Sequence, residues 1–262
     1  MKKSLLAIAL GALSAPALAI NVGGIKLPAP SPIFEATTVY ENIVSLAGVP
    51  SIAPGASING YGIVNQINGN SNICVAGWGN CELTYVFGGY TLLPGATPST
   101  LEFTGGWINF YVGTGSQINF NPFASSGQAQ DLANAADGTL WLSLAGHTFK
   151  DVITGRTGTL LSEGSNFGTG VDSGRGNGRL DVTGGLAAYH LDTNSVSDLM
   201  GGFADFDLNS TFSTVGAPPH GQTPLAGVVS IAGRSVPEPG LMALLGIGAL
   251  GIAFSARRKA VK

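Results

Sequence analysis

Short runs of alternating apolar and polar residues recur along residues 33–213. Such alternation is typical of a β-strand with one face buried and the other in water, because successive side chains point to opposite faces. In residues 82–87, for example, Leu83, Tyr85 and Phe87 share one face. Gly, Asn and Pro residues, which favour turns, separate the runs. Similar runs lie at 37–46, 57–67, 101–112, 140–144, 158–163, 178–189 and 203–212.

The number and spacing of these runs predict an all-β domain of about eight or more strands. We expect a mainly antiparallel sandwich of the jelly-roll type. A β-helix is the alternative, although no repeat of constant period supports it. Composition agrees with a β-rich chain, since 40 of the 262 residues are Gly and 10% are charged, which disfavours helices. The one short helix that the pattern predicts lies at residues 128–136.

The N-terminus has the three parts of a secretory signal peptide. Lys2 and Lys3 supply the positive charge, and a short apolar run follows them. Ala17 and Ala19 then provide the small residues of a cleavage site. A membrane anchor is disfavoured, because the apolar run is shorter than the ~20 residues of a stable span. We therefore expect export through the Sec translocon and removal of residues 1–19 by signal peptidase.

The C-terminus also has three parts, in the order motif, apolar segment and basic tail. An extended proline motif at 236–240 is followed by an uncharged segment at 241–256 and a basic tail at 257–262. The segment predicts one transmembrane helix, ~24 Å long at 1.5 Å per residue. Basic residues after the span place the tail in the cytoplasm and the rest of the chain outside. The motif consists of Val236, Pro237, Glu238, Pro239 and Gly240, and the basic cluster of Arg257, Arg258 and Lys259.

This tail resembles the PEP-CTERM sorting signal of Gram-negative bacteria that make exopolysaccharide. The resemblance covers residues 236–261. It implies that an exosortase recognises the motif and cleaves there, so that the helix holds the chain in the inner membrane only transiently. The product is then a protein of the cell surface or the extracellular matrix. A permanent single-pass anchor is the alternative.

These features predict five segments along the chain. Between the signal peptide (1–19) and the sorting signal (236–262), we expect a Pro-rich linker at 20–32, a β-rich extracellular domain at 33–213 and a second linker at 214–235. Residues 20–235 hold six basic and fourteen acidic residues, a net charge of −8. This charge disfavours nucleic acid as a partner and also direct attraction to an acidic polysaccharide.

The only two cysteines, Cys74 and Cys81, lie in the exported part. In an oxidising compartment such a pair predicts a disulfide bond. The turn between them carries Trp78, which is the best candidate for stacking on a sugar ring. Trp107 and Trp141 lie in alternating strands, and we expect both in the core.

Four aspartates are candidate calcium ligands. Asp172 and Asp181 follow a Gly-rich stretch that matches only part of a calcium-binding repeat, and nearby arginines offer them ion pairs instead. Asp205 and Asp207 project from the same face of one predicted strand, where exposed carboxylates are the ordinary explanation. No other cofactor is expected.

Catalytic motifs of serine hydrolases, zinc proteases and P-loop enzymes are absent from the sequence. We therefore expect no enzyme. Through its Gly/Asn-rich strands and the run Phe203-Ala204-Asp205-Phe206-Asp207, the middle region resembles the flocculation-associated members of the PEP-CTERM group. This resemblance implies a structural or adhesive role in a biofilm, floc or exopolysaccharide matrix. The alternative is a polysaccharide-binding or glycoside hydrolase-like protein that is exported by the same route.

Overall fold

The computed structural model describes residues 19–44, 52–75, 80–121, 127–167, 172–214 and 225–236, with the backbone alone for 37–40 and 42–44. The predicted C-terminal helix and almost all of the signal peptide lie outside this part of the chain. In the part described, no helix has the length and apolar character needed to cross a membrane.

Nearly every described segment is a strand. The helices are the 3₁₀ turn η1 (Gly115–Gln117), α2 (Gln128–Ala135) and α3 (Ala188–Leu191). The strands are β1 (Ile20–Val22), β2 (Ile25–Leu27), β3 (Ile33–Val44), β4 (Ser57–Ile67), β5 (Cys81–Leu92), β6 (Thr100–Thr114), β7 (Thr139–His147), β8 (Phe149–Lys150), β9 (Thr157–Gly158), β10 (Leu160–Ser165), β11 (Ser173–Gly184), β12 (Val196–Ser197), β13 (Phe203–Ala204), β14 (Phe206–Thr214) and β15 (Leu225–Gly233).

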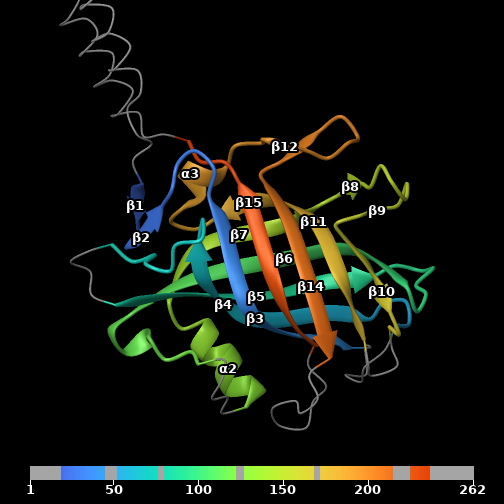
Figure 1. The fold of residues 1–262 in the computed structure, drawn as a ribbon, viewed down its shortest axis with the longest axis horizontal. Coiled ribbons are helices and arrows are strands. Elements are labelled where there is room, and N and C mark those ends of the chain that lie inside the picture. The colour runs from blue at the N-terminus through green and yellow to red at the C-terminus, as the bar shows by residue number, and fades with distance from the viewer. Residues whose placement is uncertain are drawn as a thin grey trace, which may run out of the picture.

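The large sheet closes on itself into an eight-stranded antiparallel barrel (Figure 1). Strands β11, β14, β15, β3, β4, β5 and β6 follow one another around the wall. The last position is shared by two shorter strands, because β7 and β10 each pair with both β6 and β11. The prediction of an all-β antiparallel fold is confirmed, but the predicted sandwich is wrong. Closure depends on the β7–β11 pairing between distant segments, which local alternation does not reveal.

Aromatic side chains fill one part of the barrel interior. The ring of Phe34 lies 6.0 Å from that of Phe110, 5.7 Å from that of Trp141 and 6.1 Å from that of Phe206. The Trp141 indole N–H donates a hydrogen bond of 2.8 Å to the carbonyl of Val22 in β1. The hairpin β1–β2 is therefore tied to the core, although its residues were predicted to belong to a linker.

Helix α2 covers part of the outer wall. Tyr61 of β4 and Val86 of β5 face outward and pack against Phe120 and Ala135. The hydroxyl of Thr84 donates a 2.7 Å hydrogen bond to the carbonyl of Ala135. Strand β5 is consequently buried on both faces here. The helix predicted at 128–136 is confirmed within one residue.

Two further predictions about the fold are wrong. Strand β15 lies within the predicted linker 214–235, yet it forms the wall between β14 and β3. Its Leu225, Val229 and Ile231 are all buried, so the strand is part of the core. Trp107 was expected in the core but is 39% exposed on the outer wall, whereas Trp141 is fully buried as predicted.

Candidate functional site

Both ends of the described chain lie next to predicted processing sites, at the same end of the barrel (Figure 1). Ala19 immediately precedes β1, whose Ile20 is 4% exposed. After β15, the Ser235 N–H donates to the Pro30 carbonyl at 2.8 Å, and the Val236 N–H donates to the His190 carbonyl at 2.8 Å. The described chain therefore begins at the predicted signal cleavage site and reaches the first residue of the predicted sorting motif.

This arrangement places the proline motif close to the folded domain. Residues 237–240 alone separate Val236 from the predicted apolar segment. At 3.3–3.6 Å per residue, four extended residues span at most roughly 14 Å. A protease that cuts in this motif must therefore approach the end of the barrel that carries α3 (Figure 1). The remaining sorting residues, from Pro237 to the basic cluster, lie outside the described part of the chain.

A polar groove of about 350 Å³ lies on the outside of the barrel. We call it the outer groove. Its floor is formed by β11 and β14, where Asn177 lies opposite Asn209 and Arg179 opposite Asp207. The loop after β8 forms one side of the groove, and in this loop the Val152 side chain is 72% exposed and the Ile153 side chain is 90% exposed. The other lining residues are Phe149, Lys150, Asp151, Thr154, Glu163, Arg175 and Leu199.

Ion pairs order the charged side chains of the outer groove. Glu163 accepts hydrogen bonds from Arg175 at 2.7 Å and from Arg156 at 2.9 Å. Arg179 pairs with Asp207 and stacks on the Phe149 ring, with its guanidinium carbon 4.9 Å from the ring centre. The hydrogen bond from Arg175 lowers the pKa of the Glu163 carboxyl. The groove therefore presents planar polar groups in fixed positions, with opposite charges balanced.

His147 lies between two aspartate carboxylates and connects the 196–204 loop, next to the outer groove, to the barrel wall. His147 Nδ1 lies 2.8 Å from Asp181 Oδ2, and His147 Nε2 lies 3.4 Å from Asp198 Oδ2. Desolvation lowers the pKa of His147, but hydrogen bonds and charge from both aspartates outweigh it, so the pKa is raised. Asp198 also accepts the backbone N–H groups of Met200 at 2.7 Å and Gly202 at 2.8 Å. The cluster joins the 196–204 loop to β7 and β11.

Comparison with known families decides what the C-terminus is. The family model described as the PEP-CTERM protein-sorting motif matches residues 235–259. These residues are a PEP-CTERM protein-sorting motif, which marks an exosortase substrate. The match begins at Ser235, where the hydrogen-bonded end of the barrel meets the motif. No curated protein and no solved structure matches the chain.

The aspartates predicted to bind calcium have different partners. Asp181 pairs with His147 and Asp207 pairs with Arg179. Asp205 was expected on the surface with Asp207 but is 2% exposed, because it faces backbone N–H groups of neighbouring segments. The backbone carbonyl of Asp172 accepts the Thr214 N–H at 2.9 Å. Among the residues described, no group of three or more His, Cys, Asp or Glu side chains is placed to hold a metal ion. Calcium binding stays a prediction.

The predicted disulfide bond between Cys74 and Cys81 is present. Cys74 lies beside β2, where it forms an isolated β-bridge with Ile25, and Cys81 is the first residue of β5. The disulfide bond therefore connects the segment beside β2 to the start of β5. Trp78, the predicted sugar contact, lies outside the described residues. Sequence reasoning missed Trp107 as a surface residue. Its indole lies on Gly89, where an added Cβ would stand 2.9 Å from the ring.

The outer groove was also missed as a site. Its residues come from four separate strands, from the loop after β8 and from the loop after β12, and their contact depends on the strand order. The one available signal was the alternation of polar residues Arg175, Asn177 and Arg179 along a single strand.

Proposed function

We propose that the processed protein is a non-enzymatic matrix protein that adheres to exopolysaccharide through the outer groove. The sorting motif supports this proposal, because PEP-CTERM proteins are exported and sorted to the cell surface. The observation that carries the adhesive role is the groove itself. Its volume of about 350 Å³ lies in the ordinary range for small-molecule sites, roughly 300–1,000 Å³.

The chemistry of the groove suits a sugar. Amide, guanidinium and carboxylate groups of Asn177, Arg179 and Asp207 stand in neighbouring positions on adjacent strands, where they offer donors and acceptors to hydroxyl groups. The aliphatic side chains of Val152 and Ile153 offer an apolar surface to the C–H face of a sugar ring. Because the lining charges are balanced, the groove favours a neutral saccharide over a polyanion.

Two further features support a passive role. A closed barrel leaves no long unpaired edge in its main sheet, so self-assembly by strand addition is disfavoured and binding falls to side-chain surfaces. A glycoside hydrolase needs a carboxylic acid with a raised pKa. In the outer groove the pKa of Glu163 is instead lowered, chiefly by the hydrogen bond from Arg175. The first observation favours binding through side chains over self-assembly, and the second favours adhesion over hydrolysis.

The test compares two pairs of polar residues on the outside of the barrel in the producer strain. The double variant Asn177→Ala/Asn209→Ala removes amides that line the groove. The control Thr91→Ala/Thr104→Ala removes exposed hydroxyls that lie opposite each other on β5 and β6, outside the groove. We expect the first pair to weaken co-sedimentation with the strain's own exopolysaccharide at least tenfold and to reduce flocculation, while the control behaves as wild type. Equal binding by both variants would contradict the role of the groove.

A further inference from the structure

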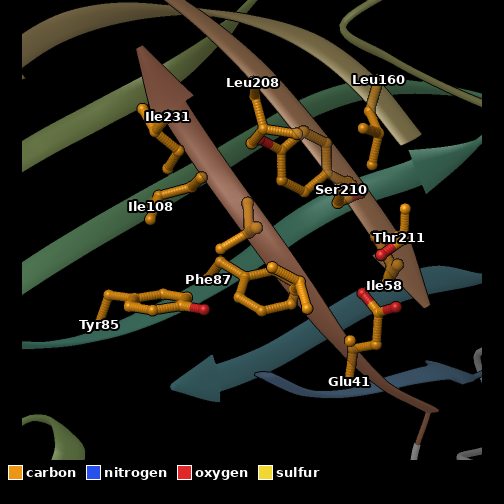
Figure 2. Close-up of a pocket in the computed structure, with 14 residues that line it drawn as sticks. Glu41, Ile58, Tyr85, Phe87, Ile108, Leu160, Leu208, Ser210, Thr211 and Ile231 are labelled. Carbon is orange, nitrogen blue, oxygen red and sulfur yellow. The ribbon is translucent and has the colours of Figure 1, made fainter. Parts of the chain in front are cut away.

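The barrel contains an internal cavity that is unrelated to the outer groove. Its volume is about 50 Å³. Apolar side chains from several strands form most of its wall, including Ile58, Phe87, Leu208 and Ile231 (Figure 2). Exposed lining residues on β14 and β15 show that the cavity approaches the surface there. The interior is therefore not completely filled by its own side chains.

One hydroxyl group in this wall lacks a partner. Tyr85 is 2% exposed, and its Oη forms no hydrogen bond with any residue of the described part of the chain. The ring lies against Gly62, where an added Cβ would stand 2.6 Å from Oη, so the glycine leaves room for the hydroxyl. Buried polar groups are nearly always hydrogen-bonded, and an exception calls for an explanation. A ligand that enters the cavity would supply the missing partner.

A carboxyl group faces the same space. Glu41 of β3 lies opposite Leu225 and Gly60 in the neighbouring strands, both buried, and its side chain lines the cavity. Figure 2 shows the carboxyl of Glu41 and the hydroxyl of Tyr85 among the groups that line the cavity, with the ring of Phe87 between them in this view. Among the described side chains, no Lys or Arg forms an ion pair with Glu41. Desolvation by burial raises the pKa of Glu41 to about 7.

We propose that the cavity binds a short aliphatic primary amine, with its ammonium group between Glu41 and Tyr85 and its alkyl chain against the apolar wall. An ammonium has three N–H donors. In the proposed complex one donates to the Glu41 carboxylate and one to the Tyr85 oxygen, and the hydroxyl groups of Tyr90, Ser210 and Thr211 are the other side-chain polar groups among the lining residues. The ion pair also compensates the cost of burying the carboxylate.

Size and charge limit the ligand further. A cavity of about 150 Å³ holds benzene, so one of about 50 Å³ encloses only a few non-hydrogen atoms. Propylamine, with four such atoms, is close to the largest chain that fits. The net charge of −8 over residues 20–235 attracts cations and repels anions of the same size.

The probe is n-propylammonium, added at pH 8 to the protein recovered from producer cells. Binding is followed by titration calorimetry and by NMR contacts between the propyl methyl group and the Ile231 methyl groups. We expect saturable binding, with n-propanol at least tenfold weaker and propionate not binding. Glu41→Gln should lower the affinity for propylammonium at least tenfold, and Tyr85→Phe should lower it severalfold.

Two controls distinguish this cavity from the rest of the acidic surface. Glu102→Gln changes a carboxylate on the outer wall, and Asn177→Ala/Asn209→Ala changes the outer groove; both should leave propylammonium binding unchanged. If Glu41→Gln binds as tightly as wild type, or if propanol binds equally well, the ammonium site is wrong. Absence of saturation at tens of millimolar propylammonium also overturns it. None of these results bears on adhesion through the groove.

Discussion

Replacing Asp205 tests whether this buried carboxylate organises the protein's backbone. Asp205 Oδ2 accepts the Val182 N–H at 2.7 Å, and Oδ1 accepts the N–H groups of Thr193 and Asn194, each at 2.6 Å. The single side chain thus joins β11 to the segment after α3. Asp205→Ala leaves three backbone donors without their acceptor.

The size of the effect follows from these three bonds. A hydrogen bond to a charged group contributes about 1.5–3 kcal/mol, and part of the loss is recovered where water reaches the freed donors. We therefore expect Asp205→Ala to lower the free energy of unfolding by about 3–5 kcal/mol. Asp205→Asn should cost less, because it retains one acceptor oxygen. Urea denaturation followed by circular dichroism measures both values.

Asp192→Ala is the matched control, since Asp192 is exposed and its carboxylate accepts a hydrogen bond of 3.3 Å from the Asn194 side-chain amide. We expect it to cost less than about 0.5 kcal/mol. A loss below about 1 kcal/mol for Asp205→Ala would refute the reasoning. The calcium hypothesis predicts something different, namely that millimolar calcium stabilises wild type but not Asp205→Ala.

Three other predictions concern stability. Reduction of the Cys74–Cys81 bond, which closes a loop of eight residues, should cost about 2.5 kcal/mol and lower the melting temperature in a calorimetric scan. Burial raises the pKa of Glu82 from 4.5 to about 7, so between these pH values the native state holds a proton that the unfolded state has lost. The free energy of unfolding should therefore fall by up to about 3 kcal/mol as the pH rises from 4.5 through 7. Glu82→Gln should remove that part of the pH dependence, measured by urea denaturation at several pH values. Gly106→Ala should destabilise the barrel by more than about 2 kcal/mol, because Gly106 has a φ of +95° and an added Cβ would overlap the Tyr90 ring; unchanged denaturant midpoints would contradict this packing.

The sequence predicted most strands because their alternation is local. Leu83, Tyr85 and Phe87 do share the inner face of β5. The same strand also shows the limit of that reasoning, since Thr84 and Val86 on the opposite face are buried by α2. Closure of the sheet depends on pairing between β7 and β11, and no periodicity along one strand reports such a distant contact.

Strand β15 was missed for a compositional reason. Its Gly and Ala residues weaken the alternating pattern, and prolines at 218, 219 and 224 precede it. Asp205 and Trp107 were misplaced because their surroundings come from other strands. A carboxylate can be buried where backbone donors converge on it, and an indole can lie outside where glycines provide a flat surface. The sorting motif was predictable because its chemistry is contiguous in the sequence.

Intact-mass analysis of the extracellular protein from producer cells tests the central claim most directly. Because the folded barrel extends from Ile20 to Val236 and the sorting motif follows at once, the account predicts a product that begins at Ile20 and ends within the motif at 236–240. The same strain without its exosortase should retain the unprocessed chain in the membrane. Matrix protein that still carries residues 241–262 would contradict the account.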